Sequence, residues 1–195
     1  AFPKRWLPFL LGVCIVGGLG FLPFSTTMLE ASALDRVSFW GQANWAFKSH
    51  PLFGVGLGMM REYIEQDRAT HNAFVLAYGE LGVFGYFFWF ALILVAAIGL
   101  IRTINAMRGR QDPDAQWLYR FSWYGLSALG GFCASSYFLS RSFVFPLFFL
   151  TCMLGAVPYV AEEYLEPDEP RLGVSIRDTV VLGVPVSLMS IVYIY

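Results

Sequence analysis

The sequence predicts an all-α fold: a polytopic transmembrane helix bundle of about five spans with one long outward-facing loop. Two observations support this fold class. Hydrophobic residues make up 57% of the 195 residues and charged residues only 14%, whereas a soluble domain carries about 25% charged residues. The apolar residues also form runs close to the roughly 20 residues that cross the hydrocarbon core of a bilayer.

The predicted spans follow one another from the first apolar run to the end of the chain. The second run is longer than one crossing requires, so its first turns are expected in the interfacial zone or the protein interior. The third run is rich in Gly, Ala and Ser, small residues that let helices approach closely in lipid. The predicted spans are residues 6–22, 73–101, 121–140, 142–161 and 179–195.

Lysine and arginine in the short connecting segments predict the orientation of these spans. They flank the first span, separate the second span from the third, and precede the fifth. With five crossings these regions share the cytoplasmic side, and the mixed, more polar segment 23–72 forms the outer loop. The basic residues used are Lys4, Arg5, Arg102, Arg108, Arg110, Arg120, Arg171 and Arg177.

Within the outer loop, residues 34–48 are expected to form an amphipathic helix that lies at the headgroup level. Its tryptophans are typical of a membrane interface. The helix must end near His50, because Pro51 disfavours the α conformation of the residue before it. The residues that recur at three- and four-residue steps are Arg36, Trp40, Ala43 and Phe47.

Several kinds of partner and site are not expected. A net charge of −1 argues against nucleic acid, which needs a basic face. The three cysteines lie in apolar runs without metal-ligand spacing, so buried thiols are expected and no metal. The run His50–Gly58 reads GxGxG but lacks the lysine–serine pair and the βαβ context of a phosphate loop, so no cofactor is expected.

His71 and Arg36 are the candidate catalytic residues on the outer side. Thr70 is predicted to be the N-cap of the helix that follows, which places His71 in its first turn. The helix dipole there favours a neutral imidazole, the form that a general base needs. The structural alternative is a histidine or an asparagine that merely caps a membrane helix. Arg36 can bind a phosphate bidentately. Its structural alternatives are an interfacial arginine that extends to the headgroups and an arginine paired with Asp35.

Further residues are expected to contribute to substrate binding. Arg61 and Arg68 would add positive charge around the site, and Asn72 follows the candidate histidine directly. Gly54 and Gly56 are expected to let the backbone turn sharply and approach another segment closely. A backbone nest for a pyrophosphate is the weaker alternative for this glycine run.

Glu80 follows His71 by nine residues. On an ideal helix that spacing places the two side chains on opposite sides. Glu80 is therefore expected to pack or hydrogen-bond toward the bundle rather than orient His71. Gly79, Gly82 and Gly85 are expected to allow close contact between helices.

In combination, these residues resemble the C-terminal part of the O-antigen ligase and O-antigen polymerase family of bacterial envelope proteins. The pattern is an arginine, a tryptophan-containing helix, HPLFGVGLG, and then HNAFV and GELGVFG. In this chain these elements are Arg36, Trp40, His50–Gly58, His71–Val75 and Gly79–Gly85. Family members are longer, so residues 1–195 are expected to form a single membrane domain belonging to a longer protein.

The resemblance implies a metal-independent glycosyltransferase of lipopolysaccharide biosynthesis, in the bacterial inner membrane with its active loop facing the periplasm. The donor would be a glycan on undecaprenyl pyrophosphate, and the acceptor a hydroxyl of lipid A core or another envelope glycan. Arg36 would hold the pyrophosphate leaving group. His71 would act as the base or position the acceptor.

Other functions remain open at this point. A polymerase, a protein O-glycosylating enzyme or a teichuronic-type enzyme would share the same motifs. A different class is a non-catalytic membrane subunit, which would bury its aromatic faces on another chain of a larger complex. A transporter would need a water path lined by Glu80.

Overall fold

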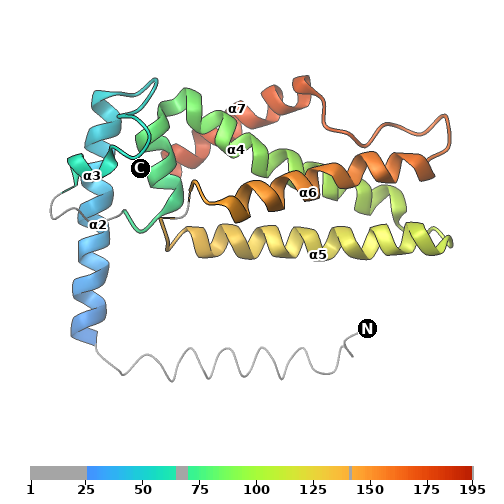
Figure 1. The fold of residues 1–195 in the computed structure, drawn as a ribbon, viewed down its shortest axis with the longest axis horizontal. Helices are drawn as coiled ribbons and strands as arrows, with labels where there is room; N and C mark the ends of the chain where they lie inside the picture. Colours follow the sequence, from blue (N-terminus) through green and yellow to red (C-terminus); the bar gives the residue numbers. More distant parts are fainter. Residues whose placement is uncertain (1–25, 65–69, 141, 195) are drawn as a thin grey trace. The chain divides into compact units, whose positions relative to one another are not determined.

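The computed structural model describes residues 26–64, 70–140 and 142–194, with side chains from residue 34 onward. The described residues form helices joined by turns and contain no strand, which confirms the all-α prediction (Figure 1). The elements are α2 (Thr26–Ser49), α3 (Met60–Tyr63), α4 (Ala73–Met107), α5 (Pro113–Ser136), α6 (Phe145–Ala161), the 3-10 turn η3 (Glu162–Tyr164) and α7 (Ile176–Ile194).

The chain divides into two compact units, residues 1–38 and 39–195. Helix α2 contains the predicted amphipathic segment 34–48 and begins earlier than predicted. It ends at Ser49, as expected from the proline two residues later. All packing described below lies within the second unit.

Three helical segments of the described chain are long and apolar enough to cross a membrane. They coincide with three of the five predicted spans. The predicted span 6–22 lies outside the described residues. The predicted span 121–140 falls largely in α5, which is helical but does not reach the same hydropathy. The three segments are Ala73–Met107, Phe145–Tyr164 and Ile176–Ile194.

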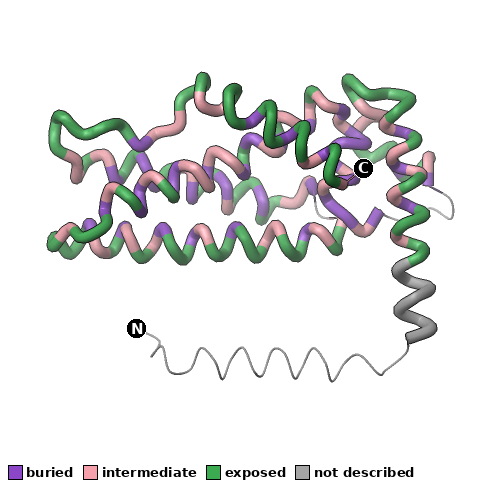
Figure 2. The backbone as a smooth tube through the Cα atoms, turned by 180° about the vertical axis from the view of Figure 1, so that it is seen from behind, coloured by how far each residue is buried: buried purple, intermediate pink, exposed green. Residues whose placement is uncertain are grey.

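Helix α4 is the central element of the bundle and packs against α5, α6 and α7. Buried positions lie along its length (Figure 2). Small residues allow the close contacts: a Cβ atom on Gly99 would lie 2.9 Å from Pro158 of α6, and one on Gly125 would lie 2.6 Å from Leu154. Cys152 on α6 is exposed, contrary to the buried thiol expected, because a residue in an apolar helix can face outward as well as inward.

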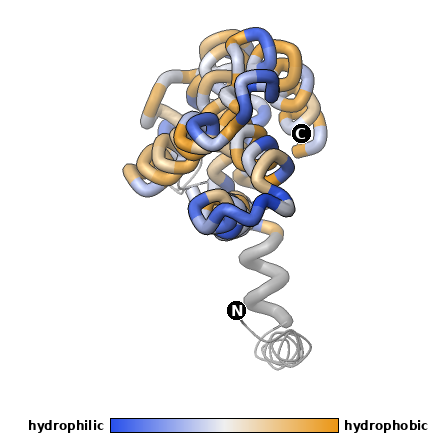
Figure 3. Tube along the Cα trace, turned by 90° about the vertical axis from the view of Figure 1, so that its right-hand side faces the viewer, coloured by the Kyte–Doolittle hydropathy of each residue, from blue (hydrophilic) through white to orange (hydrophobic). Residues whose placement is uncertain are grey.

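Charged residues gather at the end of the bundle that carries the α4–α5 turn and the α6–α7 connection (Figure 3). Arg102 near the end of α4 donates to the Gly173 carbonyl and to Asp178, each at 2.9 Å. Arg110 donates to the Tyr164 carbonyl at 2.7 Å. These bonds fasten the α6–α7 connection to α4.

Glu169 in this connection provides a pH-dependent contribution to stability. The Glu166 N–H and the Arg110 guanidinium hold the pKa of Glu169 below its ordinary value of 4.5. Because folding lowers this pKa, the carboxylate stabilises the fold above its unfolded-state pKa, and the contribution is lost as pH falls through the folded-state value.

We expect the thermal unfolding temperature in detergent to fall between about pH 6 and about pH 3. In Glu169→Gln the fall should be smaller, because this group no longer takes up a proton. An identical pH dependence in both proteins would show that the Arg110–Glu169 pair makes no measurable contribution to stability, which is the case for many exposed ion pairs.

Candidate functional site

The N-terminal part of α4 is interrupted at Gly82, which has φ 66° and ψ −175° inside an otherwise regular helix. In a continuous helix the carbonyls of Gly79 and Glu80 would accept from the N–H groups of Val83 and Phe84. At the interruption these four groups bond instead to another segment.

The glycine-rich loop 51–58 inserts at this interruption and supplies the missing partners. The N–H groups of Val55 and Gly56 donate to the Gly79 and Glu80 carbonyls, both at 3.0 Å. The carbonyls of Pro51 and Leu52 accept from the Val83 and Phe84 N–H groups at 2.9 and 3.2 Å. We call these four bonds the backbone clip.

Glycine is required where the loop and the helix meet. Gly54 has φ 69°, and a Cβ atom on it would lie 2.4 Å from the Glu80 carbonyl. A Cβ atom on Gly82 would lie 2.4 Å from the Leu52 carbonyl. The close approach predicted for the glycine run is therefore confirmed at Gly54, whereas Gly82 contacts the loop rather than a neighbouring helix.

The N–H groups that a pyrophosphate nest would use are already engaged. Gly54 donates to the His50 carbonyl at 2.8 Å, and Gly56 donates to Glu80 in the backbone clip. These two glycines hold the loop against α4 shortly before Leu57 and Gly58, which line the cavity described below.

Helix α4 is capped by Asn72 and not by Thr70, which corrects the prediction. The Asn72 Oδ1 accepts from the Phe74 and Val75 N–H groups at 2.9 and 3.1 Å. Asn72 itself is extended, as an N-cap must be. His71 therefore precedes the helix instead of lying in its first turn. Thr70 is buried and donates to the Asn72 carbonyl at 3.0 Å.

His71 has a left-handed backbone, with φ 52°. Such a conformation costs on the order of 1–3 kcal/mol and persists only where the surroundings hold it. Ser140, in the α5–α6 connection, accepts the His71 N–H at 2.8 Å through its Oγ. The same Oγ lies 3.2 Å from the Thr70 hydroxyl. Sequence reasoning missed Ser140, because it stands 69 residues from His71.

Ser142 holds the same connection against α4. Its carbonyl accepts from the Trp89 indole N–H at 2.7 Å. Its hydroxyl donates to the Ala73 carbonyl at 2.5 Å. The α5–α6 connection is thus bonded through Ser140 to His71, just before α4, and through Ser142 to α4 itself.

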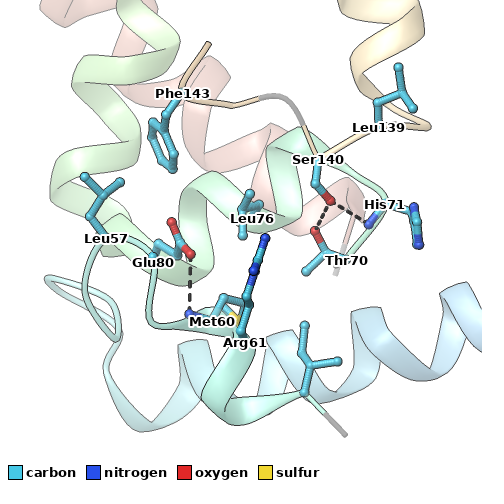
Figure 4. A pocket seen from close by; sticks show the side chains of 12 residues that line it. Leu57, Met60, Arg61, Thr70, His71, Leu76, Glu80, Leu139, Ser140 and Phe143 are labelled. Atoms are coloured by element: carbon cyan, nitrogen blue, oxygen red, sulfur yellow. Dashed lines mark hydrogen bonds between the residues drawn. The ribbon is translucent and has the colours of Figure 1, made fainter. Parts of the chain in front are cut away.

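A cavity of about 540 Å³ lies beside the start of α4 (Figure 4). Its polar lining comes from α3, α4, the residues Thr70 and His71 just before α4, and the α5–α6 connection. The polar residues are Arg61, Thr70, His71, Glu80 and Ser140. Its apolar wall includes Leu57, Leu76, Leu139 and Phe143.

Glu80 is buried, with only 4% of its surface exposed. Its carboxylate accepts the Met60 N–H at 3.3 Å, so it faces α3 and the cavity rather than the helix bundle. His71 lines the same cavity, but its imidazole points away from Glu80 (Figure 4). Glu80 and His71 share a cavity because His71 precedes the helix, so the ideal-helix spacing does not apply to it.

Of the other predicted site residues that the structure describes, Arg61 lines the cavity and Asn72 does not. Arg61 extends from α3 toward Leu76 in the cavity (Figure 4). Arg36 is half-buried on α2 and belongs to the first unit, so its place beside His71 stays a prediction. Arg68 lies outside the described residues. Asn72 acts as a cap, and its Nδ2 is buried without a hydrogen-bond partner among the described residues.

This arrangement joins four chemical features in one cavity. A guanidinium binds phosphate or another anion, and a carboxylate fixes the backbone that carries this guanidinium. An imidazole can accept and return a proton near neutral pH. The apolar wall suits a ligand with a hydrophobic portion.

Comparisons of the chain with models of protein families, with curated proteins and with solved structures found no match. Because a fold by itself does not determine function, the function must be argued from the chemistry of the site.

Proposed function

We propose that this protein is a ligase-type glycosyltransferase that moves a glycan from undecaprenyl pyrophosphate to lipid A core or another envelope acceptor. The reaction would take place at the outer face of the bacterial inner membrane. The observation that carries the proposal is that Arg61, His71 and Ser140 line the same cavity, at the end of an apolar helix.

The location of the cavity suits a lipid-carried substrate. It lies at the start of α4, the longest of the three helices among the described residues that could span a membrane. A donor whose lipid remains in the bilayer would bring its pyrophosphate to such a helix end. Leu139 and Phe143 form an apolar wall on the α5–α6 side, where the first part of the lipid can pack.

Arg61 is the residue that would bind the pyrophosphate. Negative charge grows on the leaving pyrophosphate as the glycosidic bond breaks, so a guanidinium placed there stabilises the transition state more than the bound donor. The role that the motif resemblance implies for Arg36 remains a sequence-based prediction.

His71 would act on the acceptor. The acceptor hydroxyl gives its proton to the imidazole while its oxygen forms a bond to the anomeric carbon of the donor. The bond from that carbon to the pyrophosphate oxygen breaks, and its electron pair leaves with the lipid pyrophosphate. The imidazole then returns its proton to the leaving group or to water.

Arg61→Ala tests the donor site. We expect donor binding to weaken by about 10- to 100-fold, because a charge-assisted hydrogen bond contributes about 1.5–3 kcal/mol. Full-length protein in lipid vesicles is titrated with the undecaprenyl-pyrophosphate-linked glycan, and transfer to lipid A core is measured in the same vesicles.

Arg120→Ala is the matched control, since Arg120 is exposed on α5 and bonds to Gln116 of its own helix. It should bind and transfer as the wild type does. The proposal fails if the wild type neither binds the donor nor transfers the glycan, and the protein would then be better regarded as a membrane subunit. It also fails if both arginine variants behave alike.

A further inference from the structure

The short helix α3 has no cap of its own. It comprises Met60–Tyr63, and its N-cap residue Met59 makes no side-chain hydrogen bond to it. The first N–H groups of a helix need an acceptor, which is normally a nearby side chain. Here Glu80, 20 residues further along the chain, accepts the Met60 N–H.

A buried carboxylate is expensive unless it is hydrogen-bonded or paired with a positive charge. Besides the Met60 N–H, the Gly58 backbone is a hydrogen-bond partner of the Glu80 carboxyl group. The positive charge of Arg61 also interacts electrostatically with this carboxyl group. All three partners come from the same short segment, Gly58–Arg61. Glu80 therefore binds the segment that leads into Arg61.

Two further contacts hold this segment against α4. The backbone clip fastens the preceding loop, through Val55 and Gly56, to the carbonyls of Gly79 and Glu80. The Met60 side chain is buried against Gly79, where a Cβ atom would lie 2.2 Å from the Met60 Cε. Among the α4 residues in these contacts, only Glu80 uses a side chain, so it can be altered without changing the backbone of α4.

We propose that Glu80 is a positioning residue for Arg61, acting as the N-terminal cap that α3 lacks. The proposal rests on the proposed function only in giving Arg61 the lipid pyrophosphate as its ligand. Glu80 bonds to the Met60 backbone beside the arginine and does not touch the reacting atoms. Its carboxylate thereby sets where the Arg61 guanidinium enters the cavity (Figure 4).

Glu80→Ala should weaken donor binding about fivefold, the effect of losing one helix cap, with kcat nearly unchanged. Glu80→Gln should restore most of the binding, because its amide oxygen still accepts the Met60 N–H. In an Arg61→Ala background, Glu80→Ala should cause no further loss, since the two residues act on the same interaction. Glu62→Ala, at an exposed position of α3 itself, is the control and should bind normally.

Hydrogen–deuterium exchange of the α3 segment separates this proposal from the proposed function, because it requires no substrate. Exchange at Met60–Tyr63 should be faster in Glu80→Ala than in the wild type, and close to wild type in Glu80→Gln. Unchanged exchange in Glu80→Ala would overturn the capping role even if glycan transfer is observed. Faster exchange without any glycan transfer would leave the cap intact and overturn only the proposed function. Loss of donor binding in Glu80→Ala that persists in the Arg61→Ala background would contradict positioning through Arg61.

Discussion

Replacing His71 with asparagine should lower kcat for glycan transfer by about 10²- to 10⁴-fold, with donor affinity nearly unchanged. Asparagine is chosen because it tolerates a left-handed backbone as histidine does, so the turn held by Ser140 should persist. What the variant loses is the group that accepts the proton of the acceptor hydroxyl. Steady-state kinetics in vesicles, with donor and acceptor varied separately, distinguish kcat from KM.

His50→Asn is the matched control for this experiment. His50 is the other histidine of the chain; it is exposed at the end of α2, and its ring lies 6.3 Å from that of Tyr63. It should transfer at the wild-type rate. If the two histidine variants lose activity equally, or if His71→Asn remains active with an unaltered pH–rate profile, His71 is not the base.

Gly82→Ala should destabilise the protein by about 2–5 kcal/mol, and Gly54→Ala by a similar amount. A left-handed backbone costs an L-residue roughly 1–2 kcal/mol, and overpacking adds about 1–3 kcal/mol. The overpacking here is against backbone, since each new Cβ atom would lie 2.4 Å from a carbonyl across the backbone clip. The loop and helix would have to separate, with loss of the clip's hydrogen bonds.

Substitutions at two other glycines distinguish backbone strain from overpacking as the cause of the destabilisation. Gly109 has φ 80° but open space around its Cβ position, so Gly109→Ala should show the backbone strain alone. Gly130 lies in α5 with open space and ordinary helical geometry, so Gly130→Ala should be neutral or slightly stabilising. Unfolding midpoints in detergent give the ranking. A Gly82→Ala protein no less stable than Gly109→Ala would show that the clip does not need this close approach.

The positions of the helices were largely predictable because their causes are local. Three of the five predicted apolar runs match the three segments of the described residues that could span a membrane, since run length and hydropathy are properties of the run itself. Pro51 predicted the end of α2 through its steric effect on the residue before it. The cap of α4 was predicted wrongly as Thr70, because only the tertiary structure shows that Asn72 is extended and accepts the first helical N–H groups.

The candidate site depends on contacts between distant segments, which local patterns do not contain. His71 and Arg61 were predicted as site residues from their chemical type, but Ser140 was not, because its role consists of one bond to a backbone group 69 residues away. The interruption of α4 was missed for the same reason. Gly82 can continue a helix or break it, and the loop 51–58 decides by supplying four alternative backbone hydrogen bonds.

The sequence by itself thus determined that the described residues are helical and include segments apolar enough to span a membrane, because hydropathy and proline act over a few residues. Only the tertiary structure decided that Glu80 faces Arg61 and Met60 rather than the bundle. A carboxylate has no preferred partner until folding removes water from around it. Its burial against α3 then makes the Met60 N–H its hydrogen-bond partner and places the Arg61 guanidinium in the same cavity.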